Sequence, residues 1–144
     1  MCYHKPMEIT KLKFKWPDKT ALSKGAFAII KKLRSSGFAS YIAGGAVRDA
    51  VLKIPIREID LATSARPSEV EKLFSKTIPT GKKHGTITVR LGKFNYEVTT
   101  FRSEGVYENF RRPKKVKFIK DPRQDATRRD FTINALFLIP KPWR

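Results

Sequence analysis

The sequence has little cysteine, histidine and acid. Cys2 is the only cysteine among 144 residues, so no intramolecular disulfide can form, and with only two histidines a zinc finger is excluded. Lys and Arg number 31 against 13 Asp and Glu, which gives a formal net charge of +18. This imbalance predicts affinity for polyanions such as RNA, DNA or nucleoside triphosphates.

Long hydrophobic runs are also missing. No segment approaches the run of about 18 apolar residues that a membrane span needs, and residues 1–20 lack the apolar core of a secretory signal. We therefore expect no membrane partner and a cytoplasmic location. The length and the 40% hydrophobic content predict one folded domain rather than a disordered chain.

Hydrophobic periodicity predicts alternating helices and strands. Helical spacing of apolar residues marks 21–36, 46–52, 67–75 and 121–136. Strand patterns mark 38–43, 57–63, 86–91 and 95–101, with short edge strands at 12–16 and 116–119. The ranges 86–91 and 95–101 are typical of an antiparallel hairpin. The basic segment that follows them is expected to form a mobile loop.

Two glycines separate a predicted strand from a predicted helix. Gly44 and Gly45 permit close backbone approach, so this junction can aim backbone N–H groups at an anion. Arg48 lies one turn into the helix, from where its guanidinium would reach the same phosphates. A simple tight turn is the alternative interpretation of a glycine pair at a strand end.

Carboxylates follow a strand-like spacing. Glu58 and Asp60 are two residues apart, so on a strand both side chains project from one face. Two neighbouring carboxylates repel each other, and binding of a hard divalent cation such as Mg²⁺ is the usual compensation. The alternative interpretation is that both side chains lie on a solvent-exposed face of the strand. Glu97 on a later strand is a candidate third carboxylate. Such a set supports phosphoryl or nucleotidyl transfer.

Six segments in order carry a family resemblance. They are YIAGGAVRD (41–49), EIDLATSA (58–65), HGTITVRL (84–91), YEVTTFR (96–102), RRP (111–113) and DATRRDFTINAL (125–136). Together they resemble the head domain of class II CCA-adding enzymes and bacterial poly(A) polymerases, in the DNA polymerase beta-like nucleotidyltransferase superfamily. The resemblance implies an α/β (α+β) palm with a mixed sheet and helices mainly on one side. The head would span 21–138, between an extension over 1–20 and a tail over 139–144.

The resemblance also implies roles for individual residues. The catalytic carboxylates would be Glu58, Asp60 and Glu97, with Glu58 and Asp60 as the metal ligands. The nucleotide would be bound by Gly44, Gly45, Arg48 and Arg129. The RNA would be bound by Arg111, Arg112, Lys114, Lys115 and Arg128. His84 matches the family as well, with a hydrogen-bonded turn residue as the alternative interpretation.

The implied activity is Mg²⁺-dependent addition of nucleotides from ATP or CTP to an RNA 3′ end, as in tRNA CCA addition or polyadenylation. Glu58 departs from the aspartate of the family pattern, and its extra methylene adds roughly 1.5 Å of reach. The alternative is therefore a catalytically weak RNA-binding module that retains the fold. All six segments belong to the head domain, and none belongs to the helical neck, body and tail domains of the family. A separate chain that supplies the neck and body domains is one expected partner.

Overall fold

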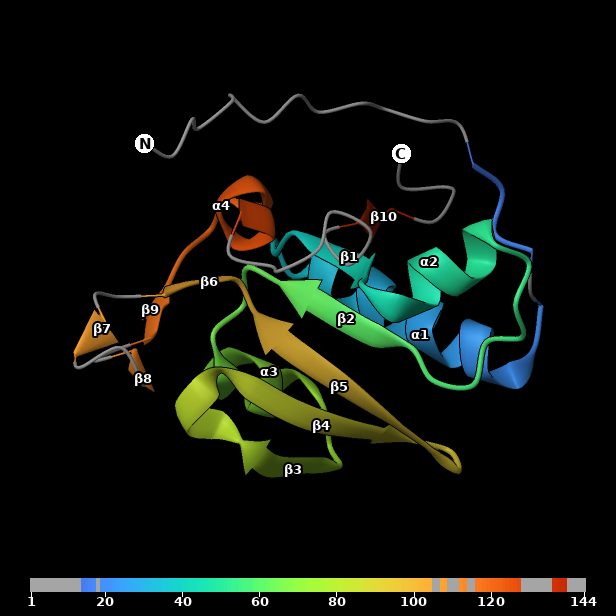
Figure 1. Cartoon of the computed structure of the whole chain (residues 1–144). Coiled ribbons are helices and arrows are strands. Elements are labelled where there is room, and N and C mark those ends of the chain that lie inside the picture. Colours follow the sequence, from blue (N-terminus) through green and yellow to red (C-terminus); the bar gives the residue numbers. More distant parts are fainter. Residues whose placement is uncertain are drawn as a thin grey trace, which may run out of the picture.

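The computed structural model describes residues 14–17, 19–104, 107–108, 112–113, 116–127 and 136–139. Its centre is a six-stranded sheet in the order β10-β1-β2-β5-β4-β3 (Figure 1). The strands are β1 (Ser40–Ala43), β2 (Asp60–Thr63), β3 (Thr77–Gly81), β4 (Thr86–Leu91), β5 (Phe94–Thr100) and β10 (Phe137–Leu138). Strands β2 and β5 run parallel, whereas the other neighbouring pairs are antiparallel. The predicted mixed sheet is confirmed.

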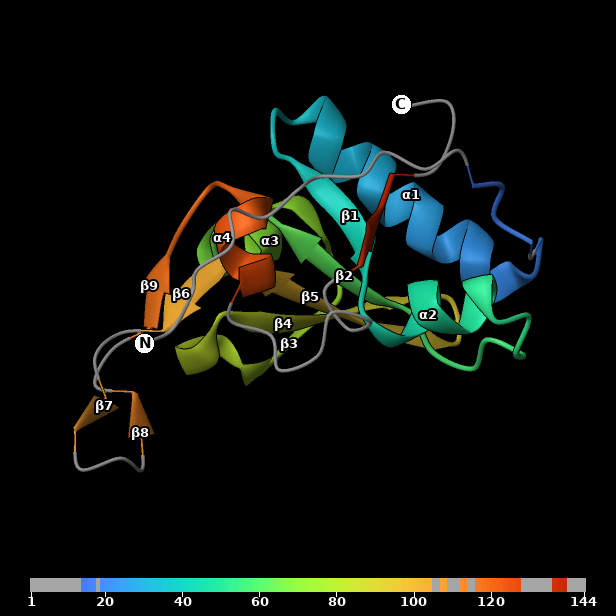
Figure 2. The same cartoon turned by 45° about the horizontal axis from the view of Figure 1, so that its top comes forward.

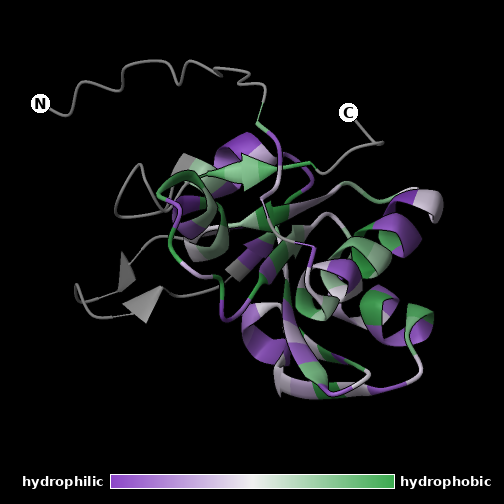
Figure 3. Ribbon diagram, turned by 90° about the vertical axis from the view of Figure 1, so that its right-hand side faces the viewer, coloured by the Kyte–Doolittle hydropathy of each residue, from purple (hydrophilic) through white to green (hydrophobic). Residues whose placement is uncertain are grey.

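Three helices cover one face of this sheet. They are α1 (Ala21–Ser35), α2 (Gly45–Val51) and α3 (Pro67–Leu73). Their apolar side chains share one buried cluster with alternate strand residues such as Ile42, Leu61 and Val98. In Figure 3 hydrophobic and hydrophilic residues alternate along the helices, as expected for helices packed on one side only. No helix in the described ranges is both long and apolar enough to span a bilayer.

Helix α1 follows directly from its sequence. Its buried apolar residues recur at helical spacing: Leu22, Ala26, Ile29, Ile30 and Leu33. The hydroxyl oxygen of Thr20 accepts a hydrogen bond from the N–H of Ser23 at 3.3 Å and caps the first turn. Gly37 adopts a φ of 91°, which ends the helix in a conformation that glycine tolerates.

The opposite face of the sheet is only partly covered. A smaller apolar cluster is built from Ala43, Ala62 and Phe101. Tyr41 and Phe137 pack against it, with their ring centroids 5.8 Å apart. The cluster covers the end of the sheet formed by β1 and β10, which lie side by side in Figure 2. The remaining residues of this face are mostly polar.

A basic arm extends from the sheet. Strand β6 (Arg102–Glu104) pairs with β9 (Val116–Phe118), and β7 (Tyr107–Glu108) pairs with β8 (Arg112–Pro113) beyond them (Figure 2). Helix α4 (Pro122–Thr127) follows, and the buried carboxylate of Asp125 accepts a hydrogen bond from the N–H of Arg102 at 2.9 Å. The arm is thus tied at its base to α4.

Several predicted elements need correction. Residues 14–16 form no strand, and β2 begins at Asp60 rather than at residue 57. The edge strand predicted over 116–119 is confirmed as β9, but its partner β6 replaces part of the expected loop, and β3 is not predicted from its sequence. Strands β3 and β6 pair through backbone hydrogen bonds, and their apolar and polar residues do not alternate clearly. Hydrophobic patterning therefore gives little signal for these two strands. The C-terminal part of the helix predicted over 121–136 lies outside the described residues.

Candidate functional site

The glycine turn lies beside the start of β2. Ala43, the last residue of β1, is the register partner of Asp60, the first residue of β2. Gly44 therefore follows directly at this edge, with φ 66° and ψ −128°, a backbone conformation that only glycine adopts readily. Its N–H donates to the carbonyl of Leu136 at 3.1 Å. The chain thus turns from β1 into α2 next to a carboxylate.

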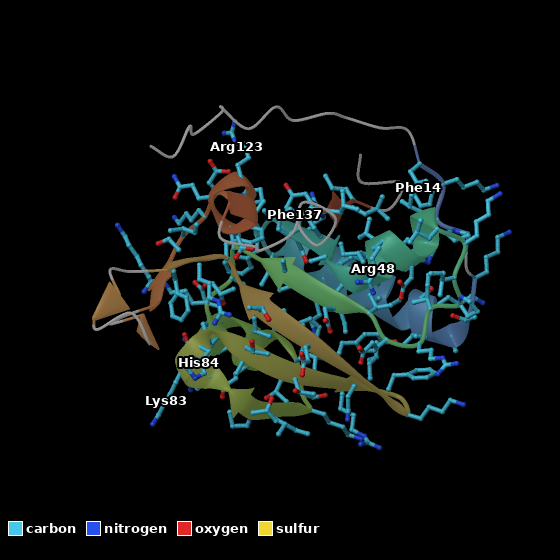
Figure 4. All side chains as sticks on the ribbon, viewed as in Figure 1. Phe14, Arg48, Lys83, His84, Arg123 and Phe137 are labelled. Atoms are coloured by element: carbon cyan, nitrogen blue, oxygen red, sulfur yellow. The ribbon has the colours of Figure 1, made fainter. Side chains whose placement is uncertain are left out.

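Arg48 folds back over this turn. A Cβ atom added to Gly45 would lie 3.3 Å from Nη2 of Arg48, so the guanidinium covers the space that the glycine leaves open. Nε of Arg48 donates to Oδ1 of Asp49 at 3.1 Å, and the Arg48 side chain remains 38% exposed. Figure 4 shows Arg48 on α2 near β2. A partly exposed guanidinium held beside a glycine turn suits a phosphate ligand.

Glu58 and Asp60 share one side of the chain. Both residues are exposed, whereas Ile59 between them is only 1% exposed and belongs to the helix-covered core. This alternation directs the two carboxylates to the same side, away from the core. Glu58 lies just before β2 rather than within it. Only Asp60 of the predicted E-x-D pair thus lies on a strand, and a shared metal-binding role of the two carboxylates stays a prediction.

In the parallel pairing of β2 with β5, Asp60 and Glu97 each directly precede a residue of the first register pair. Leu61 pairs with Val98, and both side chains are buried under the helices. One residue earlier on each strand, Asp60 and Glu97 are both exposed and so project from the opposite, open face. Neighbouring parallel strands are about 4.8 Å apart, so the two residues are adjacent at the backbone.

The donor chemistry of this edge fits Mg²⁺. The described residues contain no group of three or more His, Cys, Asp or Glu that could hold a metal ion. Glu58 and Asp60 provide two exposed carboxylates on one side of the chain. Mg²⁺ commonly uses one or two protein carboxylates, with water and substrate phosphates completing its shell. A pair of carboxylates therefore suffices where a triphosphate supplies the other oxygens.

His84 lies away from this edge. It ends the 3₁₀ helix η1 (Lys82–His84), and its side chain is exposed. Its carbonyl accepts a hydrogen bond from Nη1 of Arg102 at 2.7 Å. Figure 4 places His84 and Arg48 in separate parts of the molecule. These positions favour the interpretation of His84 as a turn residue.

The predicted RNA-binding residues are mostly beyond the described part of the chain. This holds for Arg111, Lys114, Lys115 and Arg128, and also for the predicted nucleotide ligand Arg129. Arg112 belongs to β8. Their gathering around the glycine turn stays a prediction.

Sequence reasoning missed two partners of the site. Asp49 was not assigned a role, yet its carboxylate is bonded to Arg48. The carbonyl of Leu136 binds the N–H of Gly44 across a large distance in sequence. The contact between Arg48 and Asp49 has a weak signal in the sequence, because the two residues are adjacent. No local pattern indicates the contact between Gly44 and Leu136.

Residues 40–143 match the family model described as the poly A polymerase head domain. The chain belongs to this family. The CCA-adding enzyme of Staphylococcus epidermidis is 53% identical over 108 residues, which cover 75% of this chain and 27% of that protein. The crystal structure of the Bacillus stearothermophilus CCA-adding enzyme in complex with CTP is 40% identical, with a TM-score of 0.74 over 83% of this chain and 28% of that one.

A second solved structure is a tRNA nucleotidyltransferase complexed with a primer tRNA and an incoming ATP analog. It is 28% identical, with a TM-score of 0.55 over 74% of this chain and 29% of that one. The chain thus spans between a quarter and a third of the length of each of these relatives. The nucleotidyltransferase palm predicted from the six segments is confirmed.

Proposed function

We propose that this head domain transfers a nucleotidyl group from ATP or CTP to an RNA 3′ end, with tRNA as the favoured RNA. The register of Ala43 with Asp60 carries this proposal, because the glycine turn that leads into α2 and Arg48 then begins next to Asp60. A carboxylate such as that of Asp60 is a common Mg²⁺ ligand. Two relatives support the proposal: one is a CCA-adding enzyme in complex with CTP, and the other is a tRNA nucleotidyltransferase complexed with a primer tRNA and an incoming ATP analog. Such substrates are those of a cytoplasmic tRNA-processing enzyme.

The residues of the site have distinct tasks in this proposal. Glu58 and Asp60 would hold Mg²⁺, which when bound neutralises developing charge on the phosphates. Arg48 pairs with the triphosphate, and the turn at Gly44 and Gly45 allows it to approach the backbone closely. Glu97 beside Asp60 adds negative charge that helps to retain the cation. Arg129 is the proposed second arginine on the nucleotide.

The reaction forms one P–O bond and breaks another. The 3′ hydroxyl of the RNA attacks the α-phosphate and releases its proton to solvent water, a new phosphodiester bond forms, and pyrophosphate leaves with the electrons of the broken P–O bond. Arg48 holds the triphosphate in place during this displacement, while Asp60 would hold the Mg²⁺. We assign no side chain as general base. CCA addition and poly(A) addition are both compatible with these residues, since neither base is contacted by them in this scheme.

The second candidate function is RNA binding with weak catalysis. Glu58 favours it, because a carboxylate that reaches roughly 1.5 Å further alters a site for a cation that demands strict geometry. The net charge of +18 supports RNA binding in either case. The relatives' additional length suggests that further domains, or a separate chain, contribute to tRNA binding and base selection.

Nucleotide incorporation tests the first proposal. Radiolabelled CTP or ATP is offered to tRNA lacking its 3′ CCA, with Mg²⁺ and the remaining domains of a relative fused to the chain. Asp60→Asn removes a metal ligand worth several kcal/mol of transition-state stabilisation, so incorporation should fall on the order of 100-fold or more. Glu71→Gln on α3 makes the same charge change away from the site and should leave incorporation unchanged. Equal activity of wild type and Asp60→Asn would contradict the proposal.

A further inference from the structure

Helix α1 carries positive charge without acidic compensation. Four of its residues are basic and none is acidic: Lys24, Lys31, Lys32 and Arg34. No Asp or Glu occurs anywhere between residues 19 and 48. The ion pairs described in the structure join Arg48 to Asp49, Lys82 to Glu71 and Arg123 to Asp121, so none within the described residues includes a lysine of α1.

Two of these four cations already have structural partners. Arg34 donates from Nε and Nη2 to the carbonyl of Ser40 at 3.0 and 2.6 Å. The ammonium of Lys32 lies 5.2 Å from the ring centroid of Phe74. Lys24 and Lys31 are both exposed. They are seven residues apart, so they lie on one side of the helix and about 10.5 Å apart along its axis.

The surface between Lys24 and Lys31 has one small side chain and one aromatic side chain. Exposed Ala28 lies between them on the same side of the helix, and partly exposed Phe27 is three and four residues from the two lysines. Trp16 packs edge-on against Phe27, with ring centroids 6.1 Å apart. We call this surface the α1 patch, and it consists of Lys24, Phe27, Ala28 and Lys31.

The α1 patch faces away from the candidate transfer site. The buried side of α1 packs on the sheet face that includes Leu61 and Val98. Asp60 and Glu97 project from the other face of the same two strands. An RNA segment on the patch would therefore be held separately from the 3′ end that reacts.

We propose that the α1 patch binds the sugar–phosphate backbone of an RNA helix. Exposed lysines attract phosphates without reading sequence, and small Ala28 lets a backbone approach the helix closely. Phe27 offers an apolar contact for ribose. A lipid bilayer fits less well, because the apolar side of α1 is already buried in the core and cannot insert. The choice of RNA rests on the proposed function, whereas the location of the patch does not.

Binding of a short blunt RNA duplex, without nucleotide or Mg²⁺, isolates this surface. Fluorescence anisotropy would compare the full chain with Lys24→Gln/Lys31→Gln and with the control Lys83→Gln/Lys93→Gln. Lys83 lies at η1 on the left of Figure 4, whereas α1 begins on the right. Both doubles lose the same net charge, and circular dichroism would confirm that each is folded.

We expect the α1 double variant to bind the duplex several-fold more weakly than the control. The plot of log affinity against log salt concentration should be less steep for this variant than for wild type, by roughly 1.4 to 1.8 in the magnitude of the slope, because two phosphate contacts are lost. Equal losses in both doubles, or no loss in the α1 double, would overturn the proposal. Weaker binding of the α1 double to phosphatidylserine vesicles but not to RNA would overturn it in favour of a membrane.

The two proposals fail separately. Asp60→Asn should leave duplex binding unchanged, since Asp60 is on the other face of the sheet. Absence of incorporation together with α1-dependent duplex binding would refute the transfer proposal alone. Full incorporation with duplex binding that is independent of Lys24 and Lys31 would refute the α1 patch alone.

Discussion

Gly25→Ala tests how tightly α1 packs on the sheet. In an exposed helix this change would stabilise by about 0.8 to 1.0 kcal/mol, because alanine has the higher helix propensity. Here an alanine Cβ would collide with Oη of Tyr96 and lie 2.9 Å from its Cζ. Tyr96 is fully buried, and its hydroxyl donates to the carbonyl of Leu22 at 2.7 Å. A shift of the ring away from the new Cβ would therefore break this hydrogen bond and disturb the core around it.

The packing cost should exceed the propensity gain. Overpacking of a core costs about 1 to 3 kcal/mol, and a buried hydrogen bond left unmade costs about 1 to 3 kcal/mol more. After the propensity gain is subtracted, Gly25→Ala should lower the free energy of unfolding by about 1 to 5 kcal/mol. Urea denaturation followed by circular dichroism measures this loss. Ala28→Gly on the exposed side of α1 calibrates the propensity contribution and should cost about 1 kcal/mol.

A double-mutant cycle identifies the clashing atom. Tyr96→Phe removes the hydroxyl that an alanine at position 25 would meet first. Gly25→Ala should then cost at least about 1 kcal/mol less in the Tyr96→Phe background than in the wild type. A stabilising Gly25→Ala, or an equal cost in both backgrounds, would refute this account of the α1 contact with β5.

Three further predictions concern the metal edge, the pH dependence and the arm. Restoring the shorter carboxylate with Glu58→Asp should raise Mg²⁺-dependent incorporation, and Asp60→Ala should abolish it in both backgrounds; unchanged or lower activity would show that the site is adapted to glutamate. Burial raises the pKa of Tyr96, so the folded chain keeps a proton that the unfolded chain loses. The contribution of protonated Tyr96 to the free energy of unfolding is complete below about pH 10 and is lost as the pH rises towards the pKa of Tyr96 in the folded chain. The urea midpoint should therefore fall less steeply above about pH 10 in Tyr96→Phe than in wild type. Gly85→Ala should loosen the β6–β9 ladder, because Gly85 has a φ of 91° and an added Cβ would lie 2.7 Å from Cε1 of Phe118. Faster amide hydrogen exchange in β6, compared with unchanged exchange in β5, would reveal this, and uniform exchange across both strands would contradict it.

Much of the local structure is determined by the sequence alone. Helix α1 follows from apolar spacing, the cap at Thr20 and the stop at Gly37, all of which act within a few residues. The hairpin of β4 and β5 follows from two alternating runs around a turn in which Gly92 has a φ of 60°. The order of the six motifs by itself indicates the family.

The site itself is decided by tertiary structure. Spacing indicated that Glu58 and Asp60 share a side, but only the antiparallel register of β1 with β2 puts Gly44 beside them. Only the parallel pairing of β2 with β5 puts Glu97 next to Asp60. Strand pairing depends on backbone hydrogen bonds between segments far apart in sequence, and a slip of one residue would turn each carboxylate towards the core. Local patterns therefore predict which residues are available, and the register of the sheet decides which of them meet.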